Sequence, residues 1–399
     1  MSGIWARDVG VIGGGGHVGL PLALTFAECG LKTVIYDVDR AKVEQIRSGV
    51  MPFMEDGAEG MLAKALASGT LEVRDTPEPL AECRFLVLVI GTPVDEHLNP
   101  TFTAIKRAMD GCAANFCEGQ IFILRSTVFP GISEYIQKYF EAKGLAIRVA
   151  FCPERVAQGH SLKEFRELPQ IISAFDEETL AEVRQLFAKF APETIEMPPM
   201  EAELAKLMTN AWRYIQFATV NQFYMIATEK GLDFARILEG CRRRYPRMAG
   251  MPGPGFSAGP CLVKDTMQLA AFSQHNFVLG HAAMLINEGL PYHLVNLVKR
   301  EVDLGEMTAG ILGMAFKADS DDPRDSLSYK LKKLLTLEAK RVLCSDPYVK
   351  DDQLVPVETV LAEADVIFIG APHTAYRKLA IPADKSVVDV WNCLEGESA

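Results

Sequence analysis

Short, uninterrupted apolar runs alternate with helix-like stretches along the first half of the chain. The run at 9–12 leads into a glycine-rich turn, and the apolar stretch at 20–27 that follows is typical of a buried helix. Further apolar runs lie at 33–37, 85–90, 121–124 and 149–152. Runs of this kind, separated by helices, are typical of parallel strands covered by helices on both faces. The pattern therefore predicts a doubly wound α/β unit.

The pattern changes after Pro198 and Pro199, where a long helix is indicated. Residues 201–230 show helical spacing of apolar positions up to Gly231, and a helix of this length spans roughly 45 Å. A helix this long commonly links domains or pairs with a second copy of itself. Strand and turn patterns then return at 308–316, 341–348, 361–372 and 386–390. They predict a second, smaller doubly wound unit.

The predicted fold class is α/β, with two Rossmann-like doubly wound domains joined by a central helical segment that contains one long helix. The predicted boundaries place the first domain at 1–198, the central helical domain at 199–300 and the last domain at 301–399.

The turn after the first apolar run carries the spacing G-x-G-x-x-G between a strand and a helix. Glycines here bring the backbone against a pyrophosphate, which then lies at the helix N-terminus. The turn residues expected to contact a dinucleotide are Gly14, Gly16, His17, Val18 and Gly19. Asp37 ends the next strand, where a carboxylate accepts from a ribose diol and repels a 2′-phosphate. This favours NAD as the cofactor, while Arg40 nearby leaves NADP open.

Polar residues follow the later strands of this unit. In parallel sheets, ligands bind outside the carboxyl ends of the strands, so Thr92 and Thr127 are candidates to contact the cofactor or the reacting atoms. Glu154 also follows a strand and is a candidate base or water-orienting group. The alternatives are hydroxyls that satisfy turns and a solvated loop carboxylate.

Two polar residues on the long helix and a thiol after a Gly/Pro-rich turn are the strongest candidates for chemistry. Lys206 and Asn210 are four residues apart, so they share a helix face and suit the stabilisation of an oxyanion; the alternative is a solvated face. Cys261 is a candidate nucleophile, with Lys264 and Asp265 following within one helical turn. By itself a single cysteine is more typical of an inert buried side chain.

Basic residues mark two possible contacts with phosphates. Arg247 belongs to the dense basic cluster at 242–247, which could bind phosphates. The alternative is that these cations only stabilise the C-terminus of a helix. Lys317 and Arg324 flank the crevice expected at the first strand end of the last domain and suit a nucleotide diphosphate. The loop between them also carries several acids, so it is alternatively self-neutralised.

Composition narrows the partners. The 399 residues carry a formal net charge of −11, which argues against nucleic acid or an anionic membrane surface as a partner. The longest apolar runs are too short to span a bilayer, and no signal-peptide pattern opens the chain. Nine scattered cysteines without C-x-x-C spacing, and seven histidines without ligand spacing, predict reduced thiols in a cytoplasm and no metal site.

An ordered set of motifs resembles the nucleotide-sugar 6-dehydrogenases, which comprise the UDP-glucose, UDP-N-acetylmannosamine and GDP-mannose dehydrogenases. The motifs cover nearly the whole chain and are Gly14-x-Gly16-His17-Val18-Gly19-Leu20-Pro21, Ser126-Thr127-Val128-x-Pro130-Gly131, Pro153-Glu154-Arg155, Glu201-x-Glu203-Leu204-x-Lys206-x-x-x-Asn210, Cys261-x-x-Lys264-Asp265 and Gly313-x-Ala315-Phe316-Lys317 through Arg324. The segment from Pro153 to Val156 looks more like the N-acetylhexosamine branch.

The resemblance implies an NAD-binding domain, a helical dimerisation segment, and a last domain that binds a nucleotide sugar, with a UDP-sugar as the expected substrate. It implies a four-electron oxidation of a sugar CH2OH to a carboxylate, with Cys261 forming a thiohemiacetal and then a thioester. Lys206 and Asn210 would stabilise the oxyanion, Asp265 and Thr127 would order water and relay protons, and Glu154 would assist hydrolysis. It further implies a cytoplasmic homodimer that makes precursors for surface polysaccharides or for glycosylated natural products.

Lys264 would lie by the cofactor or the sugar. The remaining residues expected to contact substrate are Arg155, Arg247, Gly255, Phe256, Gly259, Lys317 and Arg324. Two departures from the family pattern concern the sugar. The glycine-rich approach to Cys261 is one residue longer, from Gly255 to Pro260, and Gln158 stands where some UDP-glucose enzymes carry a second acid.

Two other functions remain as alternatives at this stage. One is a two-electron hydroxyacid dehydrogenase in which the central lysine acts alone as the base. The other is a non-catalytic protein that binds a nucleotide sugar. The first has no need of Cys261, and the second has no use for a thiol beside an oxyanion site.

Overall fold

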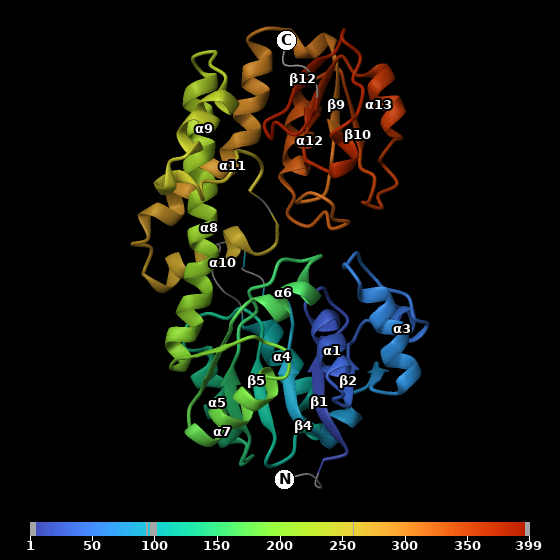
Figure 1. Cartoon of the computed structure of the whole chain (residues 1–399), viewed down its shortest axis with the longest axis vertical. Helices are drawn as coiled ribbons and strands as arrows, with labels where there is room; N and C mark the ends of the chain where they lie inside the picture. The colour runs from blue at the N-terminus through green and yellow to red at the C-terminus, as the bar shows by residue number, and fades with distance from the viewer. Residues whose placement is uncertain (1–4, 93–94, 96–101, 258, 396–399) are drawn as a thin grey trace. The chain divides into compact units, whose positions relative to one another are not determined.

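The computed structural model describes residues 5–92, 95, 102–257 and 259–395 (Figure 1). The chain divides into two compact units, residues 1–208 and residues 209–399, and each is described by itself. Helix α8 (Pro199–Thr228) continues across the division, close to the range 201–230 predicted for the long helix. The predicted fold class is confirmed, with a mainly parallel α/β sheet in the first unit, a parallel one in the second, and the long helix between the two sheets in sequence. The boundaries at 198 and 300 stay predictions.

The first unit contains an eight-stranded sheet in the order β3-β2-β1-β4-β5-β6-β7-β8. Its strands are β1 (Arg7–Ile12), β2 (Thr33–Tyr36), β3 (Leu71–Arg74), β4 (Cys83–Leu88), β5 (Ile121–Leu124), β6 (Arg148–Phe151), β7 (Gln170–Ala174) and β8 (Thr194–Glu196). β1 pairs with β2 on one side and with β4 on the other, so the strand order reverses between β1 and β4. That reversal places the expected ligand crevice at the carboxyl ends of these two strands.

The sheet departs from the predicted all-parallel arrangement at β7 and β8. β7 pairs antiparallel with β6, and β8 is parallel to β7. An antiparallel neighbour needs no long crossover connection. Accordingly, the only helix between β6 and β7 in the described chain is the short α6 (Ser161–Glu167). This arrangement was not visible in the apolar pattern, because strand direction depends on tertiary pairing.

Helices cover both faces of this sheet, and each face has its own apolar core. The helices are α1 (Gly19–Glu28), α2 (Arg40–Arg47), α3 (Ala58–Ser68), α4 (Thr103–Cys112), α5 (Ile132–Ala142), α6 and α7 (Glu177–Phe187). One core joins α1 to Val9, Val11 and Ile35, and the other joins α5 to Phe122 and Leu124. Alternate side chains of a strand point to opposite faces, which is why continuous apolar runs formed these strands.

The second unit contains a four-stranded parallel sheet in the order β10-β9-β11-β12. Its strands are β9 (Thr308–Leu312), β10 (Arg341–Ser345), β11 (Val366–Ile369) and β12 (Ser386–Val388). Its remaining helices are α9 (Phe234–Arg242), α10 (Leu262–Phe272), α11 (Val278–Lys299), α12 (Leu327–Glu338) and α13 (Val357–Glu363). Leu290 and Leu294 on α11 pack with Leu331 on α12 in one core with β9. The strand order reverses between β9 and β11.

Among the described residues, no helix is both long and apolar enough to cross a membrane.

Candidate functional site

The turn between β1 and α1 has the geometry of a dinucleotide-binding turn. The helix begins at Gly19 and has no acidic residue in its first turn, so its N-terminal amides suit an anion. A side chain on Gly14 would press on Ile35, and one on Gly19 would press on the Gly14 backbone. These two glycines therefore serve the packing of the turn itself, with Val18 as the N-cap residue of α1.

Gly16 is different, because a Cβ atom built there meets only the carbonyl oxygen of Gly13, at 3.9 Å. Packing within the protein therefore does not require a glycine at this position. The absent side chain leaves the backbone open to close approach by a ligand, which is the role of the second glycine in dinucleotide turns. The residues present here fit the pyrophosphate of NAD.

Asp37 is the acid predicted to accept from a ribose diol. Its carboxylate accepts hydrogen bonds from the amides of Gly15 at 2.8 Å and Asp39 at 3.0 Å, and the residue remains partly exposed. Arg40 points to Asp75 at 3.5 Å, and its side chain is 85% exposed. His17 stacks on Phe53, with 4.1 Å between the ring centroids. The partly exposed Asp37 carboxylate, together with an exposed Arg40 that pairs with Asp75, suits NAD rather than NADP.

The threonines after β4 and β5 contact each other. The Thr92 hydroxyl donates to the carbonyl oxygen of Thr127 at 2.6 Å, and Ser126 bridges to the backbone of Ile90 at 2.8 Å. The structure thus brings the two strand-end loops together. For Thr92 it shows the turn-satisfying contact that was the alternative interpretation. The side chain of Thr127 is partly exposed.

Glu154 is buried and paired with a residue whose role sequence reasoning missed. The carboxylate accepts from the guanidinium of Arg125, and also from the amides of Arg155 at 2.6 Å and Val156 at 2.8 Å. The Arg125 side chain is fully buried and donates to Gln170 at 2.8 Å as well. The alternative of a solvated loop carboxylate is therefore wrong. Burial also lowers the pKa of Arg155, whose guanidinium donates to the carbonyl oxygen of Pro169.

Glu203, a second residue whose role was missed, joins the start of α8 to the start of α5. Its buried carboxylate accepts from the amides of Gly131 at 2.6 Å and Ser133 at 2.8 Å, and from the Ser133 hydroxyl at 2.7 Å. Burial raises the pKa of Glu203, against the effect of these hydrogen bonds. Lys206 follows one turn later on α8 and is only 7% exposed. The solvated-face alternative for Lys206 is therefore wrong.

Asn210, Lys264 and Asp265 form a buried polar cluster in the second unit. The Asn210 amide donates to Asp265 at 2.6 Å, and the Lys264 ammonium lies 3.1 Å from the other carboxylate oxygen. The Asp265 side chain is fully buried, and it belongs to the first turn of α10. A buried carboxylate requires such partners, because unpaired burial of a charge is costly. Lys264 therefore contacts Asp265, which the sequence did not indicate.

Cys261 is exposed and is the N-cap residue of α10. Thiolates are favoured at helix N-termini and beside cations. Arg324 is a cation of the same unit. Its hydrogen bonds to Asp322 are the largest cause that raises its pKa, and Cys261 is among the smaller causes. Cys261 is therefore not a buried thiol, whereas Cys83, Cys112, Cys152 and Cys344 are buried.

The glycine-rich approach to Cys261 packs tightly against aromatic rings. A Cβ atom on Gly255 would lie 2.3 Å from the Trp391 ring, and one on Gly259 would lie 2.6 Å from Phe316. Phe256 is buried beside Trp391. Asn221, another missed residue, donates to the carbonyl oxygen of Gly255 at 3.0 Å and accepts from its amide at 2.9 Å. Ala258, within the lengthened segment, lies outside the described residues.

The predicted phosphate-binding cations occupy different surroundings. Arg324 donates to both carboxylate oxygens of Asp322, at 2.6 Å to the nearer one, so the loop is partly self-neutralised. The Lys317 ammonium lies 6.0 Å from the Phe316 ring. Arg247 is exposed and stacks on Tyr245. Among the described residues, Arg247 shows a contact with Tyr245, and its predicted contact with substrate stays a prediction.

Metal ligation is not indicated in the part of the chain that the structure describes. There, no group of three or more His, Cys, Asp or Glu side chains is arranged to hold a metal ion.

Comparison with known protein families assigns the three parts of the chain. Residues 7–191 match the NAD binding domain of the UDP-glucose/GDP-mannose dehydrogenase family, residues 200–288 match its central domain, and residues 310–396 match its UDP binding domain. The match to the first domain confirms the predicted cofactor, NAD.

Individual relatives resemble the chain over nearly its full length. The UDP-N-acetyl-D-mannosamine dehydrogenase of Pyrococcus horikoshii is 29% identical over 91% of this chain and 89% of its own length. The NDP-N-acetyl-D-galactosaminuronic acid dehydrogenase of Ralstonia solanacearum is 26% identical over 94% of this chain and 92% of its own.

Solved structures show the same fold. A UDP-D-ManNAc dehydrogenase from Pyrococcus horikoshii superposes with a TM-score of 0.89 at 27% identity, covering 97% of this chain and 96% of its own. A UDP-glucose dehydrogenase from Pyrobaculum islandicum also gives 0.89, at 26% identity over 98% of this chain and 96% of its own. The predicted enzyme class, an NAD-dependent nucleotide-sugar dehydrogenase, is confirmed, and the chain belongs to the UDP-glucose/GDP-mannose dehydrogenase family.

Proposed function

We propose that this chain oxidises the C6 hydroxymethyl group of a UDP-sugar to the carboxylate in four electrons, through a covalent intermediate on Cys261. NAD, when bound by the first unit, accepts the hydrides that the oxidation releases. The observation that carries the proposal is the exposed Cys261 thiol at the N-terminus of α10, a position that favours a thiolate. A single alcohol oxidation needs no thiol, whereas oxidation beyond the aldehyde benefits from a nucleophile.

The bond changes balance as follows. The alcohol loses a hydride and a proton and becomes the aldehyde. The Cys261 thiolate adds to the aldehyde carbon, a C–S bond forms, and the oxygen takes a proton to give a thiohemiacetal. Loss of a second hydride and the hydroxyl proton gives a thioester. Water then adds to the carbonyl carbon, the C–S bond breaks, and the carboxylate and the thiolate are released.

The buried polar residues of α8 and α10 suit the oxygen that becomes negative in these steps. We assign Lys206 and Asn210 to stabilise it, because both are nearly fully buried and donors act strongly where water is excluded. Asp265 holds the Asn210 amide at 2.6 Å, which fixes the orientation of that donor. In this assignment Asp265, together with Thr127, also orders water and relays protons.

Thioester hydrolysis requires a group that accepts a proton from water. We assign this to Glu154. The hydrogen bonds from Arg125 and from the amides of Arg155 and Val156 hold its carboxylate in one orientation, and carboxylate oxygens are acceptors. In this assignment Arg125 positions Glu154.

The sugar is proposed to be a UDP-N-acetylhexosamine or a UDP-hexose. The relative from Pyrococcus horikoshii at 29% identity, a UDP-N-acetyl-D-mannosamine dehydrogenase, supports the first of these. The proposed substrate contacts are Arg155, Arg247, Gly255, Phe256, Gly259, Lys317 and Arg324. Among them Gly255 and Gly259 are places where added side chains would collide with Trp391 and Phe316, so these two shape the approach to Cys261.

A homodimer is part of the proposal. Apolar side chains are exposed along α8 from Trp212 onward, with Trp212 62%, Phe223 44% and Ile226 57% exposed. Exposed apolar surface marks association sites, and a second copy of the same helix is its proposed partner. Light scattering of the purified chain tests this, and a monomer at micromolar concentration would contradict it.

The experiment that tests the function measures NADH formed per nucleotide sugar consumed, across UDP-N-acetylmannosamine, other UDP-N-acetylhexosamines, UDP-glucose and GDP-mannose. The expected result is two NADH per UDP-sugar and a uronate product. Replacement of Cys261→Ala is expected to reduce acid formation by about 10³-fold or more, and Cys261→Ser to slow it sharply.

Cys344→Ala is the matched control, since Cys344 is a buried thiol in the same unit. One NADH per sugar that is independent of Cys261 would instead indicate a two-electron dehydrogenase. Binding without any NADH would indicate a non-catalytic protein.

A further inference from the structure

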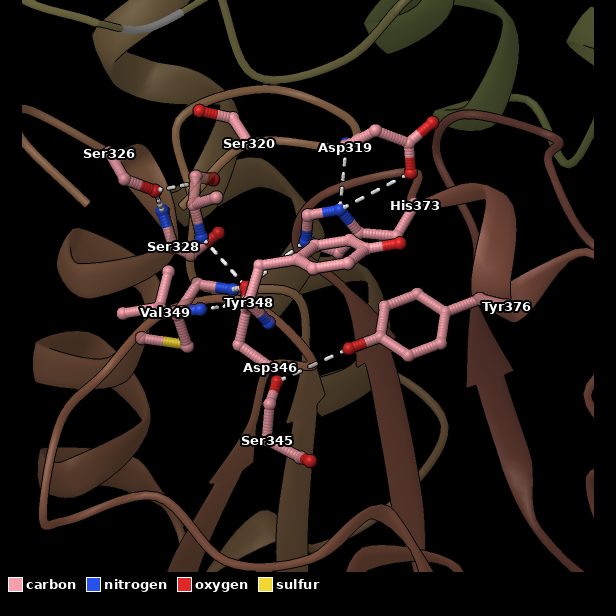
Figure 2. A network of polar contacts seen from close by, with 12 residues as sticks. Asp319, Ser320, Ser326, Ser328, Ser345, Asp346, Tyr348, Val349, His373 and Tyr376 are labelled. Carbon is pink, nitrogen blue, oxygen red and sulfur yellow. Dashed lines mark hydrogen bonds and ion pairs between the residues drawn. The ribbon is translucent and has the colours of Figure 1, made fainter. Parts of the chain in front are cut away.

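One imidazole joins the loops that follow three neighbouring strands of the second sheet. His373 follows β11 and is fully buried. It lies between Asp319, in the loop after β9, and Asp346, directly after β10, with the rings of Tyr348 and Tyr376 beside it (Figure 2). The sheet order reverses between β9 and β11, and ligands in such sheets bind at that reversal. His373 therefore spans the crevice where a nucleotide is expected.

The hydrogen bonds define the tautomer of His373. Its Nδ1 accepts from the backbone amide of Asp319 at 2.9 Å, so that nitrogen carries no proton. Its Nε2 lies 3.0 Å from the Asp346 carboxylate, which only accepts, so Nε2 carries the proton. Each nitrogen of the ring thus binds a different loop.

Asp346 anchors this arrangement. One of its carboxylate oxygens accepts from the amides of Met314 at 2.6 Å and Ala315 at 3.0 Å, at the start of the loop after β9. The other accepts from the amides of Tyr348 at 2.8 Å and Val349 at 2.9 Å. A fully buried carboxylate with these donors is rigid. It fixes the orientation of the His373 ring.

The loop held by this ring carries the two cations assigned to the nucleotide. Lys317 precedes Asp319 by two positions, and Arg324 follows it by five. Asp319 has a left-handed backbone, with φ of 49°, and Asp325 has φ of 51°. Such conformations are unfavourable for residues other than glycine and persist where surrounding contacts impose them. At Asp319 those contacts are the His373 ring and Thr374, whose amide and hydroxyl donate to its carboxylate at 2.8 Å and 2.6 Å.

We propose that His373 is a positioning residue for substrate binding: it holds the loop from Lys317 to Arg324 in the shape that binds the diphosphate of the nucleotide sugar. The proposal rests on the function proposed above for Lys317 and Arg324. His373 acts through Asp319 and has no part in the redox chemistry. Its loss therefore weakens nucleotide binding while NAD binding and the chemical steps remain.

Three substitutions separate the two nitrogens. His373→Leu removes both hydrogen bonds. His373→Asn keeps an acceptor near the position of Nδ1, and His373→Gln keeps a donor near the position of Nε2. The measurements are UDP affinity by calorimetry, and kcat, KM for the UDP-sugar and KM for NAD on the full chain. His373→Leu is expected to weaken UDP binding and raise KM for the UDP-sugar by about 10-fold to 100-fold, with kcat and KM for NAD within about threefold.

His373→Asn is expected to recover most of the affinity, because it retains the bond to the Asp319 amide, and His373→Gln to recover less. Thr374→Ala removes one support of Asp319 at an exposed position, so it serves if His373→Leu does not fold. It is expected to weaken UDP binding by about threefold. His293→Asn is the matched control, since His293 is a partly buried histidine of the same unit, bonded to Thr228 at 2.8 Å. It should leave UDP affinity unchanged.

The outcomes separate the inference from the function on which it rests. If the native chain binds no UDP, the proposed function fails. If it binds UDP and His373→Leu binds equally well, the positioning role is wrong. A parallel loss of kcat, NAD affinity and UDP affinity would also overturn it, because that pattern indicates general destabilisation. If His373→Asn bound UDP no more tightly than His373→Leu, the hydrogen bond to the Asp319 amide would be excluded as the way in which His373 acts.

Discussion

The first strand of each sheet is followed by a glycine that is bound in the same way. The Gly13 amide donates to the carbonyl oxygen of Tyr36 at the end of β2, and the Gly313 amide donates to that of Ser345 at the end of β10, both at 2.8 Å. An aspartate then follows each partner strand, Asp37 in one unit and Asp346 in the other. Each aspartate accepts from an amide in the turn after the glycine, at Gly15 and at Ala315. The two units therefore share one local design.

The two units differ in what covers the aspartate. Asp37 is partly exposed, and the helix after β1 begins already at Gly19, so the turn beside Asp37 is short and open to a ribose and a pyrophosphate. The Asp346 side chain is fully buried under His373, and the helix after β9 begins only at Leu327. In the second unit the carboxylate thus supports a long charged loop instead of meeting a ligand. In the proposed roles, the aspartate at this strand end binds a ligand where it is open, as at Asp37, and supports a loop where a side chain covers it, as at Asp346.

The largest expected effect comes from removing Asp346, the carboxylate that His373 covers. Asp346→Ala leaves four backbone amides and the His373 ring without their acceptor inside the protein. Because each unsatisfied buried donor costs about 1 kcal/mol or more, the free energy of unfolding should fall by about 4 kcal/mol. Urea denaturation followed by circular dichroism measures this.

Asp37→Ala is the matched comparison, with an expected loss of about 1 kcal/mol. Equal losses in the free energy of unfolding of the two variants would contradict the distinction between the covered Asp346 and the open Asp37.

A smaller effect is expected from pH. Burial by itself would raise the pKa of Asp346, but the hydrogen bonds from His373 and the amides of Val349 and Tyr348 outweigh it and lower the pKa to about 2. A carboxyl group whose folded pKa lies below its unfolded value stabilises the fold at higher pH. About 2 kcal/mol should therefore be lost as the pH falls from about 4 to about 2.

The measurement is the free energy of unfolding of the native chain and of Asp346→Asn as the pH is lowered. The variant should show a shallower dependence over this range. Identical slopes would mean that another carboxylate carries the effect.

Much of the fold was predictable because it depends on local patterns. Apolar runs located β1, β2, β4, β5 and β6 of the first sheet, and the glycine spacing with Asp37 predicted a cofactor-binding turn between β1 and α1, since these features lie close together in sequence. The strands β3, β7 and β8 were not predicted. The direction of β7 was not predictable, because it depends on which strand it pairs with.

The supports of the site were less visible in the sequence. Glu203 caps α5 from 70 residues away, and His373 meets Asp346 from 27 residues away. Each residue alone looks like an ordinary polar residue on a helix or in a loop. The exposure of Cys261 and the burial of Lys206 likewise depend on tertiary contacts, which the sequence does not show. The roles of both residues stay predictions until they are tested.

The smallest expected effect concerns the open acid and its function. Asp37→Ala should raise KM for NAD about tenfold, equivalent to about 1.4 kcal/mol, because the ribose loses a charge-assisted hydrogen bond. The kcat at saturating NAD and the affinity for UDP should remain within about twofold, since the second unit keeps its own covered acid, Asp346. Arg40→Ala is the control: its pair with Asp75 is largely exposed, and such pairs contribute little, so KM for NAD should not change. Steady-state kinetics with NAD and NADP decide the matter. If Asp37→Ala altered UDP affinity as strongly as NAD affinity, the two acids would not serve separate ligands, and the division of roles between the units would have to be abandoned.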